Sequence, residues 1–396
     1  MRTRTMARVL VLGGGYAGML AAARVARHGN AQITLVDQRP GFVQRIRLHE
    51  ALAGATPPGL AYGPALARRG GRFVQARVLG IDPARQEVSI AADGAERRLG
   101  YDALIVALGS ASVPAAPGVA EYALRLNDPA AVAPFGAELR SLAARGGQAL
   151  IVGGGLTAIE TAAELAEQLP GLRVTLAMSG TLGADFSAVG RQYLRDSLTR
   201  LGVQIREGSP VVALEPGRAW LASGEALAYD RCVWASGFAA PALLAESGLP
   251  VDAQGRAVVS ATLQVRGNPT LIVAGDSAAA GDAGRAIRMG CVSAMPLGAH
   301  AGENAAALLS GEALRPFQFG FPGRCVSLGR HSGIFQFTDR LDRPVERIIS
   351  GRAGATVKEL ICQMTLATVR GELRTALPLY QWRGGGGWWA AAPAAA

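Results

Sequence analysis

The alternation of apolar and polar positions predicts two copies of one supersecondary unit. Near the start, the apolar run RVLVL from Arg8 leads into Gly13, Gly15 and Gly18 and then into the amphipathic stretch LAAARVARHG. A second copy starts at Ala149 as ALIVGGGLTAIETAAEL. Each copy has a buried strand, a glycine turn and a helix in succession, which is the pattern of a dinucleotide-binding unit.

The first copy has an acid where a nucleotide needs one. Its second strand, AQITLVD, ends at Asp37, about twenty residues after the loop, where a carboxylate binds a ribose hydroxyl. Glycines let the backbone approach a pyrophosphate, and the helix N-terminus points its amides at it. We therefore expect Gly13, Gly15, Gly18 and Asp37 to hold a nucleotide. The alternative is a tight turn without a ligand.

The second copy differs at the end of its second strand. Its loop is a GxGxxA variant made of Gly153, Gly155 and Ala158. The strand LRVTLAM ends at Met178, where the first copy has its acid. An acid there favours NADH and repels a 2′-phosphate, so its absence permits NADPH, with Arg191 or another arginine as the pairing charge. Weak discrimination between the nucleotides and loss of the ligand stay open.

The segments between and after these units predict the other elements. RFVQARVLGIDPARQEVSI and RRLGYDALIVALGS predict strands, with a turn at Asp82-Pro83 and an end near Gly109. The Pro- and Ala-rich residues 113–144 predict a connection into the second unit. NPTLIVAGDSAAAG predicts a strand that ends at Gly275-Asp276.

The last third predicts a mixed segment and a tail. CVSAMPLGAHAGENAAALLSG predicts a helix that is broken near Pro296, because proline removes a backbone donor. PFQFGFPGRCVSLGRHSGIFQF predicts strands, and TVKELICQMTLATVRGEL predicts an amphipathic helix. RGGGGWWAAAPAAA from Arg383 has the low complexity typical of disorder.

Composition narrows the class of protein. The chain has 396 residues, with 49% apolar and 18% charged side chains, which is typical of a globular protein of two or three domains. It lacks an apolar run long enough to cross a membrane, and we interpret the basic, apolar start as the first strand rather than a signal peptide. The net charge of +10 favours anionic nucleotides or an anionic membrane face. Without a basic stripe that contains aromatic residues, the chain is not expected to bind nucleic acid.

The four cysteines, Cys232, Cys291, Cys325 and Cys362, are scattered. Because none has CxxC or CxxxxC spacing, the sequence predicts neither a metal site nor a tandem redox disulfide. We expect ordinary buried thiols.

The ordered motifs resemble the type II NADH dehydrogenase-like branch of the pyridine nucleotide-disulfide oxidoreductase superfamily, without its redox-active disulfide. The resemblance runs from about Arg8 to Glu372 and rests on both glycine loops, YDALIVALGS and LIVAGD. It implies an α/β fold with two Rossmann-like dinucleotide-binding domains and a smaller C-terminal domain. The implied division is 1–115 and 260–315 for FAD, 116–259 for NAD(P)H, 316–383 for the C-terminal domain and 384–396 for a disordered Gly/Ala-rich tail.

The resemblance also implies a site. FAD would lie on the first loop, with Asp276 on its ribityl or pyrophosphate part, and NADH or NADPH would lie on the second. Glu160 would lie near nicotinamide and flavin, although a solvated helix residue is the plain alternative. The implied cofactor-binding residues are Gly13, Gly15, Tyr16, Ala17, Gly18, Asp37, Gln38, Arg45, Val78, Ala107, Gly109, Gly153, Gly155, Leu156, Thr157, Ala158, Gly237, Gly275, Asp276 and Met295. The implied catalytic positions are Glu160, Pro296 and Leu297.

The implied reaction is hydride transfer from NAD(P)H to flavin, followed by electron transfer to a quinone or quinone-like small molecule. GFVQRIRLHEALAG contains no cysteine, so electrons would leave the flavin directly. Pro296-Leu297 replaces the family's glutamine pair and His300 its tyrosine, which favours another, dedicated small-molecule substrate. A non-catalytic redox sensor is a third hypothesis. Arg45, Arg47 and His49 also depart from a stretch that is mostly apolar in the family.

The predicted helix that begins near Thr356 bears on whether the protein contacts a membrane. Val357, Leu360, Ile361 and Met364 have helical spacing. Packing onto the flavin domain explains them, and an interfacial membrane helix is the alternative. We expect a cytoplasmic protein, with peripheral contact to the inner face of the cell membrane and a homodimer both left open.

Overall fold

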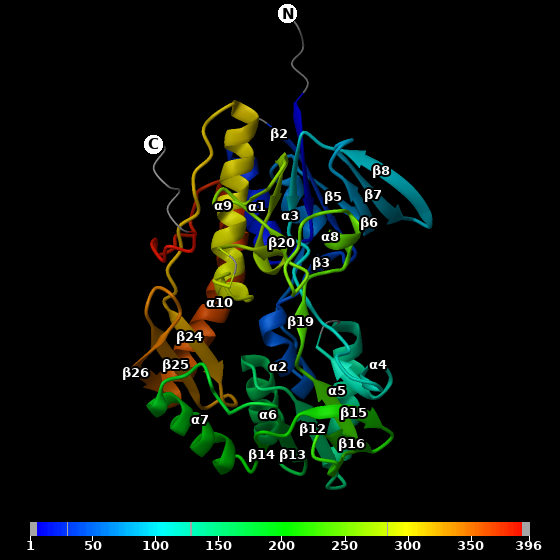
Figure 1. Ribbon diagram of the computed structural model, residues 1–396, viewed down its shortest axis with the longest axis vertical. Coiled ribbons are helices and arrows are strands. Elements are labelled where there is room, and N and C mark those ends of the chain that lie inside the picture. The colour runs from blue at the N-terminus through cyan, green and yellow to red at the C-terminus, as the bar shows by residue number, and fades with distance from the viewer. Residues whose placement is uncertain (1–5, 30, 127–128, 283, 390–396) are drawn as a thin grey trace, which may run out of the picture.

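The computed structural model describes residues 6–29, 31–126, 129–282 and 284–389. Figure 1 shows an upper part and a lower part, each built on its own sheet, with α10 (Gly351–Thr375) and α2 (Leu48–Ala53) reaching between them. The predicted α/β fold with two dinucleotide-binding frames is confirmed by the sheet topology.

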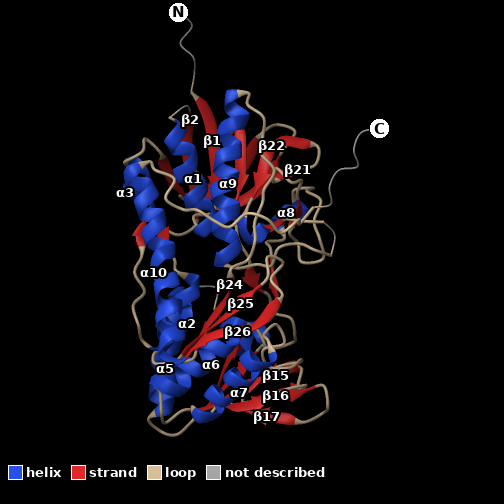
Figure 2. Cartoon of the chain, turned by 90° about the vertical axis from the view of Figure 1, so that its left-hand side faces the viewer, coloured by secondary structure: helices blue, strands red, loops and turns tan. Residues whose placement is uncertain are grey.

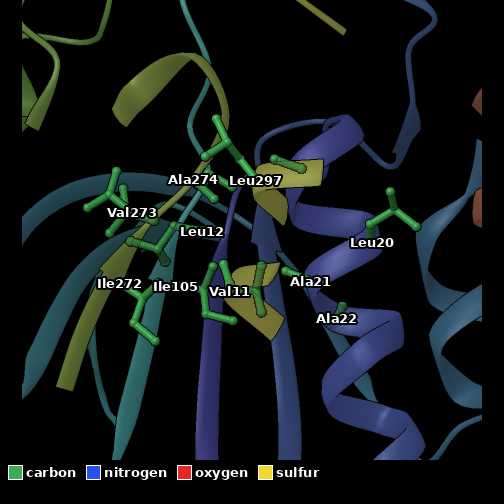
Figure 3. Packing of buried hydrophobic residues seen from close by; sticks show 14 of the residues in the cluster. Val11, Leu12, Leu20, Ala21, Ala22, Ile105, Ile272, Val273, Ala274 and Leu297 are labelled. Atoms are coloured by element: carbon green, nitrogen blue, oxygen red, sulfur yellow. The ribbon is translucent and has the colours of Figure 1, made fainter. Parts of the chain in front are cut away.

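The upper sheet has the strand order β21-β22-β9-β1-β2-β5, and all its pairs are parallel except β21–β22. The strands are β1 (Ala7–Leu12), β2 (Ala31–Asp37), β5 (Arg72–Gln75), β9 (Ala103–Val106), β21 (Gln264–Val265) and β22 (Asn268–Val273). Val11 lies opposite Leu35 and Ile105, and Ile105 lies opposite Ile272. These rows of aliphatic side chains are the core of the upper part (Figure 3).

Two helices, α1 (Tyr16–His28) and α9 (Cys291–Ser310), pack against this sheet and against each other. A Cβ atom on Gly298 would lie 2.2 Å from the Ala17 carbonyl oxygen, and one on Gly302 would lie 2.5 Å from that of Ala21. Glycine is therefore required at both positions, because the two backbones approach closely. The contact holds α9 over the first glycine loop.

The predicted break in α9 at Pro296 is wrong, because the helix runs through this residue. Proline removes one backbone donor, from its own nitrogen. The packing of α9 on α1 and on the sheet involves most of the helix, which outweighs the loss of one hydrogen bond. Leu297, the next residue, faces the core beside Ala274 (Figure 3).

The lower sheet is parallel throughout, with the order β11-β18-β12-β13-β14. Its strands are β11 (Ala123–Arg125), β12 (Gln148–Val152), β13 (Arg173–Ala177), β14 (Gln204–Arg206) and β18 (Arg231–Trp234), and its helices are α5 (Pro129–Ala143), α6 (Leu156–Gln168) and α7 (Ala188–Arg200). Ile151 lies opposite Leu176 and Val233 in the same manner as Val11 above. The two parts are thus built alike.

The helix α5 lies within residues 113–144, where the sequence predicted a connection. It buries Val132, Leu139 and Leu142. A Cβ on Gly136 would lie 2.4 Å from the Leu52 carbonyl oxygen, so α5 also packs closely on α2. Its alanine content and Pro134 hid the helical spacing of these few apolar residues.

The chain crosses between the two parts through a short antiparallel ribbon of β10 (Ala111–Ser112) and β19 (Phe238–Ala239). After this ribbon, Ala240, Leu244 and Leu249 pack into the upper core. The return to the upper part therefore precedes the predicted boundary at 259.

The C-terminal region joins the two parts. β24 (Gly323–Ser327), β25 (Gly333–Thr338) and β26 (Pro344–Ser350) form an antiparallel sheet against α10. Val326 and Ile334 belong to the lower core, while Leu366 and Val369 belong to the upper core. Figure 2 shows α10 running along both parts.

The first residues of the expected disordered tail are packed. Phe319 donates its backbone N–H to Gly385, and Trp388 donates its indole N–H to the Phe319 carbonyl oxygen at 2.7 Å. Trp388 is buried. Two indole rings add enough apolar area to order a glycine segment. Residues 390–396 lie outside the described residues.

The remaining elements are short. They are β3 (Gly41–Phe42), η1 (Arg45–Arg47), β4 (Leu60–Ala61), α3 (Tyr62–Ala67), β6 (Arg77–Asp82), β7 (Glu87–Ala92), β8 (Ala95–Gly100), α4 (Val119–Tyr122), β15 (Val211–Glu215), β16 (Arg218–Leu221), β17 (Ala226–Ala228), α8 (Leu243–Glu246), β20 (Ala257–Val258), η2 (Gly275–Ser277) and β23 (Ala278–Ala279).

Candidate functional site

The first glycine loop lies at the carboxyl end of β1. Gly13 has a φ of 93°, and a Cβ there would lie 2.4 Å from the Ala107 carbonyl oxygen. A Cβ on Gly18 would lie 1.8 Å from the Gly13 carbonyl oxygen, so the loop closes tightly on α1. Gly15, by contrast, faces open space and leaves the first amides of α1 without a side-chain cap. This is the shape of a pyrophosphate cradle.

The carboxyl ends of the neighbouring strands bring the other predicted residues to the same edge, as a parallel sheet requires. Asp37 ends β2 and accepts the Gly14 N–H at 2.7 Å and the Arg39 N–H at 2.8 Å. Asp276 follows β22 and accepts the Ser110 hydroxyl at 2.7 Å and the Gly290 N–H at 2.8 Å. Two carboxylates thus flank the cradle.

The loop after β9 is connected to the Asp276 segment by hydrogen bonds. Gly109 has a φ of 73° and accepts the Ser277 hydroxyl at 3.0 Å. Arg45 donates to the Ser110 carbonyl oxygen at 2.5 Å, and the charge of Asp276 acts on it. The structure therefore brings Gly13, Arg45, Gly109 and Asp276 into one neighbourhood.

Tyr16, the first residue of α1, supplies an independent test for a ligand. It is buried, and among the described residues its hydroxyl finds no acceptor for its proton, although the Ile46 backbone N–H lies near its oxygen. Burial raises the pKa of this hydroxyl well above its usual value, so it stays a neutral donor. A buried hydroxyl whose proton has no acceptor, beside a glycine loop with uncapped amides, fits a bound polar group such as a nucleotide.

The second loop repeats this geometry on the lower sheet. Gly153 has a φ of 142°, and a Cβ there would lie 2.6 Å from the Ala235 carbonyl oxygen. Gly155 faces open space at the uncapped N-terminus of α6. Met178, at the strand end that lacks an acid, is buried. The loop can therefore hold a second dinucleotide.

A buried ion pair lies one turn into α6. Glu160 is 6% exposed, and its Oε1 lies 2.9 Å from the ammonium of Lys358 on α10. Glu160 also accepts the Ser327 N–H at 3.0 Å. Burial alone would raise the pKa of Glu160, but the charge of Lys358 outweighs it and holds that pKa below its usual value. The solvated alternative for Glu160 is wrong.

The Lys358–Glu160 pair acts on residues at both glycine loops. Glu160 follows the lower loop by one helical turn, and the charge of Lys358 also acts on Tyr16 at the upper loop. Lys358 is the chain's one lysine. Although burial opposes its charge, Glu160 raises the pKa of Lys358 well above its usual value. A buried ammonium therefore lies beside the helix that follows the lower loop and within electrostatic reach of Tyr16 at the upper loop.

A second layer of charges surrounds the pair. Glu50 accepts Arg47 at 2.9 Å and pairs with Arg330 at 3.2 Å. Arg330 also donates to Glu164 at 2.8 Å. Burial, opposed by Arg330, raises the pKa of Glu164 to about 7. This charged layer of Arg47, Glu50, Glu164 and Arg330 connects α2, α6 and the β24–β25 loop.

Three of the four free cysteines lie in the same region. The charge of Lys358 acts on Cys291, Cys325 and Cys362. Burial nevertheless raises the pKa of Cys291 to about 11 and that of Cys362 to about 12. These groups are neutral thiols at physiological pH.

The other predicted site residues are spread around the two loops. Ala17, Met295 and Leu297 are buried where α9 meets α1, whereas Gln38 is exposed and Val78 lies in the outer sheet β6-β7-β8. Leu156 and Thr157 open α6, and Gly237 receives the Val113 N–H at the crossing ribbon. Ala107 and Ala158 are buried behind their loops, and Pro296 is buried inside α9. Their roles stay predictions.

Sequence reasoning did not assign the charged layer, Ser327 or the role of Lys358. The one lysine in an arginine-rich chain was the available signal, because a single ammonium among 40 basic residues marks an unusual requirement. Its partner lies far away in the sequence, so spacing gives no indication of the pair. Within the described residues, no helix is long and apolar enough to span a membrane.

Comparisons with known proteins agree with this geometry. The family model described as pyridine nucleotide-disulphide oxidoreductase matches residues 7–298. An NADH dehydrogenase-like protein of Mycobacterium tuberculosis is 31% identical over 383 residues, covering 90% of this chain and 93% of the relative. The alternative NAD(P)H-ubiquinone oxidoreductase C1 of Arabidopsis thaliana is 28% identical, covering 82% of this chain and 72% of the relative.

Solved structures share the fold at low identity. The sulfide:quinone oxidoreductase of Aquifex aeolicus has a TM-score of 0.81 and 18% identity, covering 92% of both chains. The NDH2 of Plasmodium falciparum, solved with NADH, has a TM-score of 0.75 and 13% identity, covering 93% of this chain and 97% of the other. The chain therefore belongs to the pyridine nucleotide-disulphide oxidoreductase family, as an NADH dehydrogenase-like oxidoreductase that uses flavin and NAD(P)H.

Proposed function

We propose that the protein transfers a hydride from NAD(P)H to FAD and passes the electrons to a quinone or a quinone-like small molecule. The observation that carries this proposal is the buried Lys358–Glu160 pair, which lies one helical turn after the lower glycine loop and acts electrostatically on Tyr16 at the upper one. FAD, when bound, supplies the hydride-accepting chemistry. The name of the Arabidopsis relative supports a quinone as acceptor.

FAD fits the first loop because that loop offers contacts for both halves of a dinucleotide. The uncapped amides at Gly15 and the helix N-terminus would bind the pyrophosphate. Asp37 would accept a ribose hydroxyl with the lone pairs that Gly14 and Arg39 leave free. Asp276, held by Ser110, would contact the ribityl part.

Lys358 has an electrostatic role in this reaction. Two electrons that enter the site bring negative charge, and a buried ammonium held in place nearby stabilises that charge without reorganisation. Glu160 keeps Lys358 charged and in position despite its burial. Tyr16, at the first glycine loop, adds a hydroxyl whose proton has no acceptor among the described residues.

We further propose that the enzyme uses both NADH and NADPH. Met178 supplies neither an acid that repels a 2′-phosphate nor a charge that binds it. On the neighbouring strand, Arg206 already donates to Glu225 at 2.6 Å, which weakens its attraction for another anion. We expect kcat/KM values within about tenfold of each other, and a Met178→Asp variant to favour NADH. Equal ratios before and after this change would contradict the role of this strand end.

A membrane surface is the proposed source of a lipophilic acceptor. Leu360, Met364, Leu377 and Leu379 are 49–60% exposed. Leu360 and Met364 share one face of α10, and a Cβ on Gly371 would touch Leu379, so the segment after α10 returns to this face. Arg68, Arg370 and Arg374 line an adjacent cavity of about 140 Å³. An apolar face beside arginines suits anionic lipid.

Flotation with phosphatidylglycerol vesicles tests this surface. A Leu360→Asp/Met364→Asp variant should lose vesicle binding, while Val189→Asp, which changes an equally exposed apolar residue on α7, should keep it. If the double variant still binds vesicles, the proposed membrane surface is contradicted, and the proposed redox reaction is not affected.

Anaerobic stopped-flow at 450 nm tests the reaction itself. Bleaching of bound flavin by NADH or NADPH and rapid reoxidation by ubiquinone or menaquinone analogues are the expected results. The buried Pro296-Leu297 pair, which replaces two amides, favours a second candidate, a dedicated small-molecule substrate. Bleaching followed by slow reoxidation with every quinone would support that candidate. Flavin that never bleaches would favour a redox sensor.

A further inference from the structure

His49 occupies a position between two buried carboxylates. It lies on α2 and is 2% exposed. Its Nδ1 is 3.9 Å from Glu160 Oε2, and its Nε2 is 4.0 Å from Glu50 Oε1. The Ser327 hydroxyl lies 3.2 Å from Nε2 and 3.3 Å from Glu160 Oε1. Each ring nitrogen therefore faces a different carboxylate.

The outer carboxylate leads toward the surface. Glu50 pairs with Arg47 and Arg330, and the Arg330 side chain is 32% exposed. Arg47 in turn binds Glu359 on α10 at 2.6 Å, whose side chain is 42% exposed. The inner carboxylate, Glu160, is held by Lys358 and lies one helical turn after the lower glycine loop. Arginines stay protonated and pass no proton on, so a proton enters this line at Glu50, whose side chain is 8% exposed, and the next groups inward are His49 and Glu160.

The proposed reaction consumes a proton. In the balanced equation NAD(P)H + H⁺ + A → NAD(P)⁺ + AH₂, the hydride carries two electrons and one hydrogen. The second hydrogen of the reduced acceptor comes from water as a proton. Because Glu160 and His49 are 6% and 2% exposed, a proton that reaches this region by way of them moves between protein groups rather than through bulk water.

We propose that His49 relays this proton from Glu50 to Glu160. The inference rests on the proposed function, because the acceptor reaction creates the demand for the proton. In the step, the O–H bond of protonated Glu50 breaks and an N–H bond forms at Nε2. The N–H bond at Nδ1 then breaks and an O–H bond forms on Glu160. The ring ends in its other tautomer, with its N–H at Nε2.

The charge state of the ring suits this role. Burial lowers the pKa of His49 to about 4, so the imidazole is neutral and has one N–H and one free lone pair. The groups that face it are Glu160 and Lys358 on one side and Glu50 and Arg330 on the other. Both gaps are about 1 Å longer than a hydrogen bond, and such contacts often tighten in a liganded active site.

The first test separates the two half-reactions. His49→Gln keeps a polar side chain near Ser327 but cannot carry a proton through a ring, and His331→Gln changes an exposed histidine as the control. Flavin bleaching by NADH should change by less than about twofold in both variants. Reoxidation by a quinone should slow by about tenfold or more in His49→Gln, with an altered pH profile and solvent isotope effect. Reoxidation with unchanged rate and pH profile would overturn the relay.

The second test does not depend on turnover. The chain has four histidines, so ¹⁵N-histidine NMR resolves each ring, and the His49→Gln spectrum assigns His49. The buried His49 ring N–H should exchange rapidly with water, and Glu50→Gln should slow this exchange by about tenfold or more. Exchange that is equal in Glu50→Gln and wild type would overturn the relay. If wild-type flavin never bleaches while Glu50 controls the exchange, the proposed function fails and the proton path stands.

Discussion

Replacement of Lys358 by methionine removes the cation of a buried pair and keeps the length of the side chain. The two side chains are 12% and 7% exposed, with 2.9 Å between nitrogen and oxygen. At an effective dielectric constant of about 20, charges at that distance attract by about 6 kcal/mol. The Ser327 N–H, which stays in place, retains part of the stabilisation of the carboxylate.

Protonation limits the loss. Without Lys358, burial raises the pKa of Glu160 above its ordinary 4.5, and the folded variant takes up a proton. At pH 7.5 this costs about 4 kcal/mol, because each pH unit above the ordinary value costs 1.36 kcal/mol. Since the unfolded chain releases this proton above pH 4.5, the variant loses stability as pH rises. We expect a deficit of about 4 kcal/mol at pH 7.5 and about 1.4 kcal/mol at pH 5.5.

Urea unfolding of the flavin-loaded protein at these two pH values measures the deficit. Lys358→Arg should recover most of the stability, and Lys358→Met/Glu160→Gln should be more stable than Lys358→Met because glutamine needs no proton uptake on folding. A deficit that is the same at both pH values would refute the reasoning. A double variant as unstable as the single one would show that packing, not charge, explains the loss.

Further changes test other parts of the site. Asp37→Ala should lower flavin affinity by about tenfold or more, because the ribose loses a charged acceptor; the ratio of absorbance at 450 and 280 nm in purified protein checks this, and unchanged flavin content would contradict it. Gly298→Ala should destabilise the fold by about 3 kcal/mol, since its Cβ would strike the Ala17 backbone, whereas Gly155→Ala enters open space and should raise KM for NAD(P)H with little change in Tm. Cys291 and Cys362 should react with iodoacetamide at pH 8 at less than about a tenth of the rate of free cysteine, because burial raises both pKa values to about 11 and 12; equal rates in a mass-spectrometric time course would argue against neutral thiols.

The sequence predicted what depends on local chemistry. Gly13 and Gly153 need left-handed backbone angles, and each follows an aliphatic strand, so a few adjacent residues specify each loop. Parallel pairing then brings Asp37 and Asp276 to one edge without further information. For that reason both nucleotide loops could be identified from patterns of about thirty residues.

What the sequence did not reveal depends on contacts between distant segments. The helix α9 continues through Pro296 because it packs on α1. Trp388 is held in place by its hydrogen bond to the Phe319 carbonyl oxygen. The sequence around Glu160 is consistent with a solvent-exposed position on a helix. Its burial depends on Lys358 of α10, which is almost two hundred residues away in the sequence.

The position of Lys358 on α10 has a consequence for how the enzyme is built. The C-terminal region buries residues in both cores, so it fixes the two nucleotide parts relative to each other. The same helix supplies the ammonium, and α2 supplies His49 and Glu50 from the same boundary. These charged groups therefore come into contact with one another when the upper part, the lower part and α10 are packed together. A buried charge without its partner costs several kcal/mol. Any arrangement of the upper and lower parts that separates Lys358 from Glu160 is therefore destabilised by about that amount.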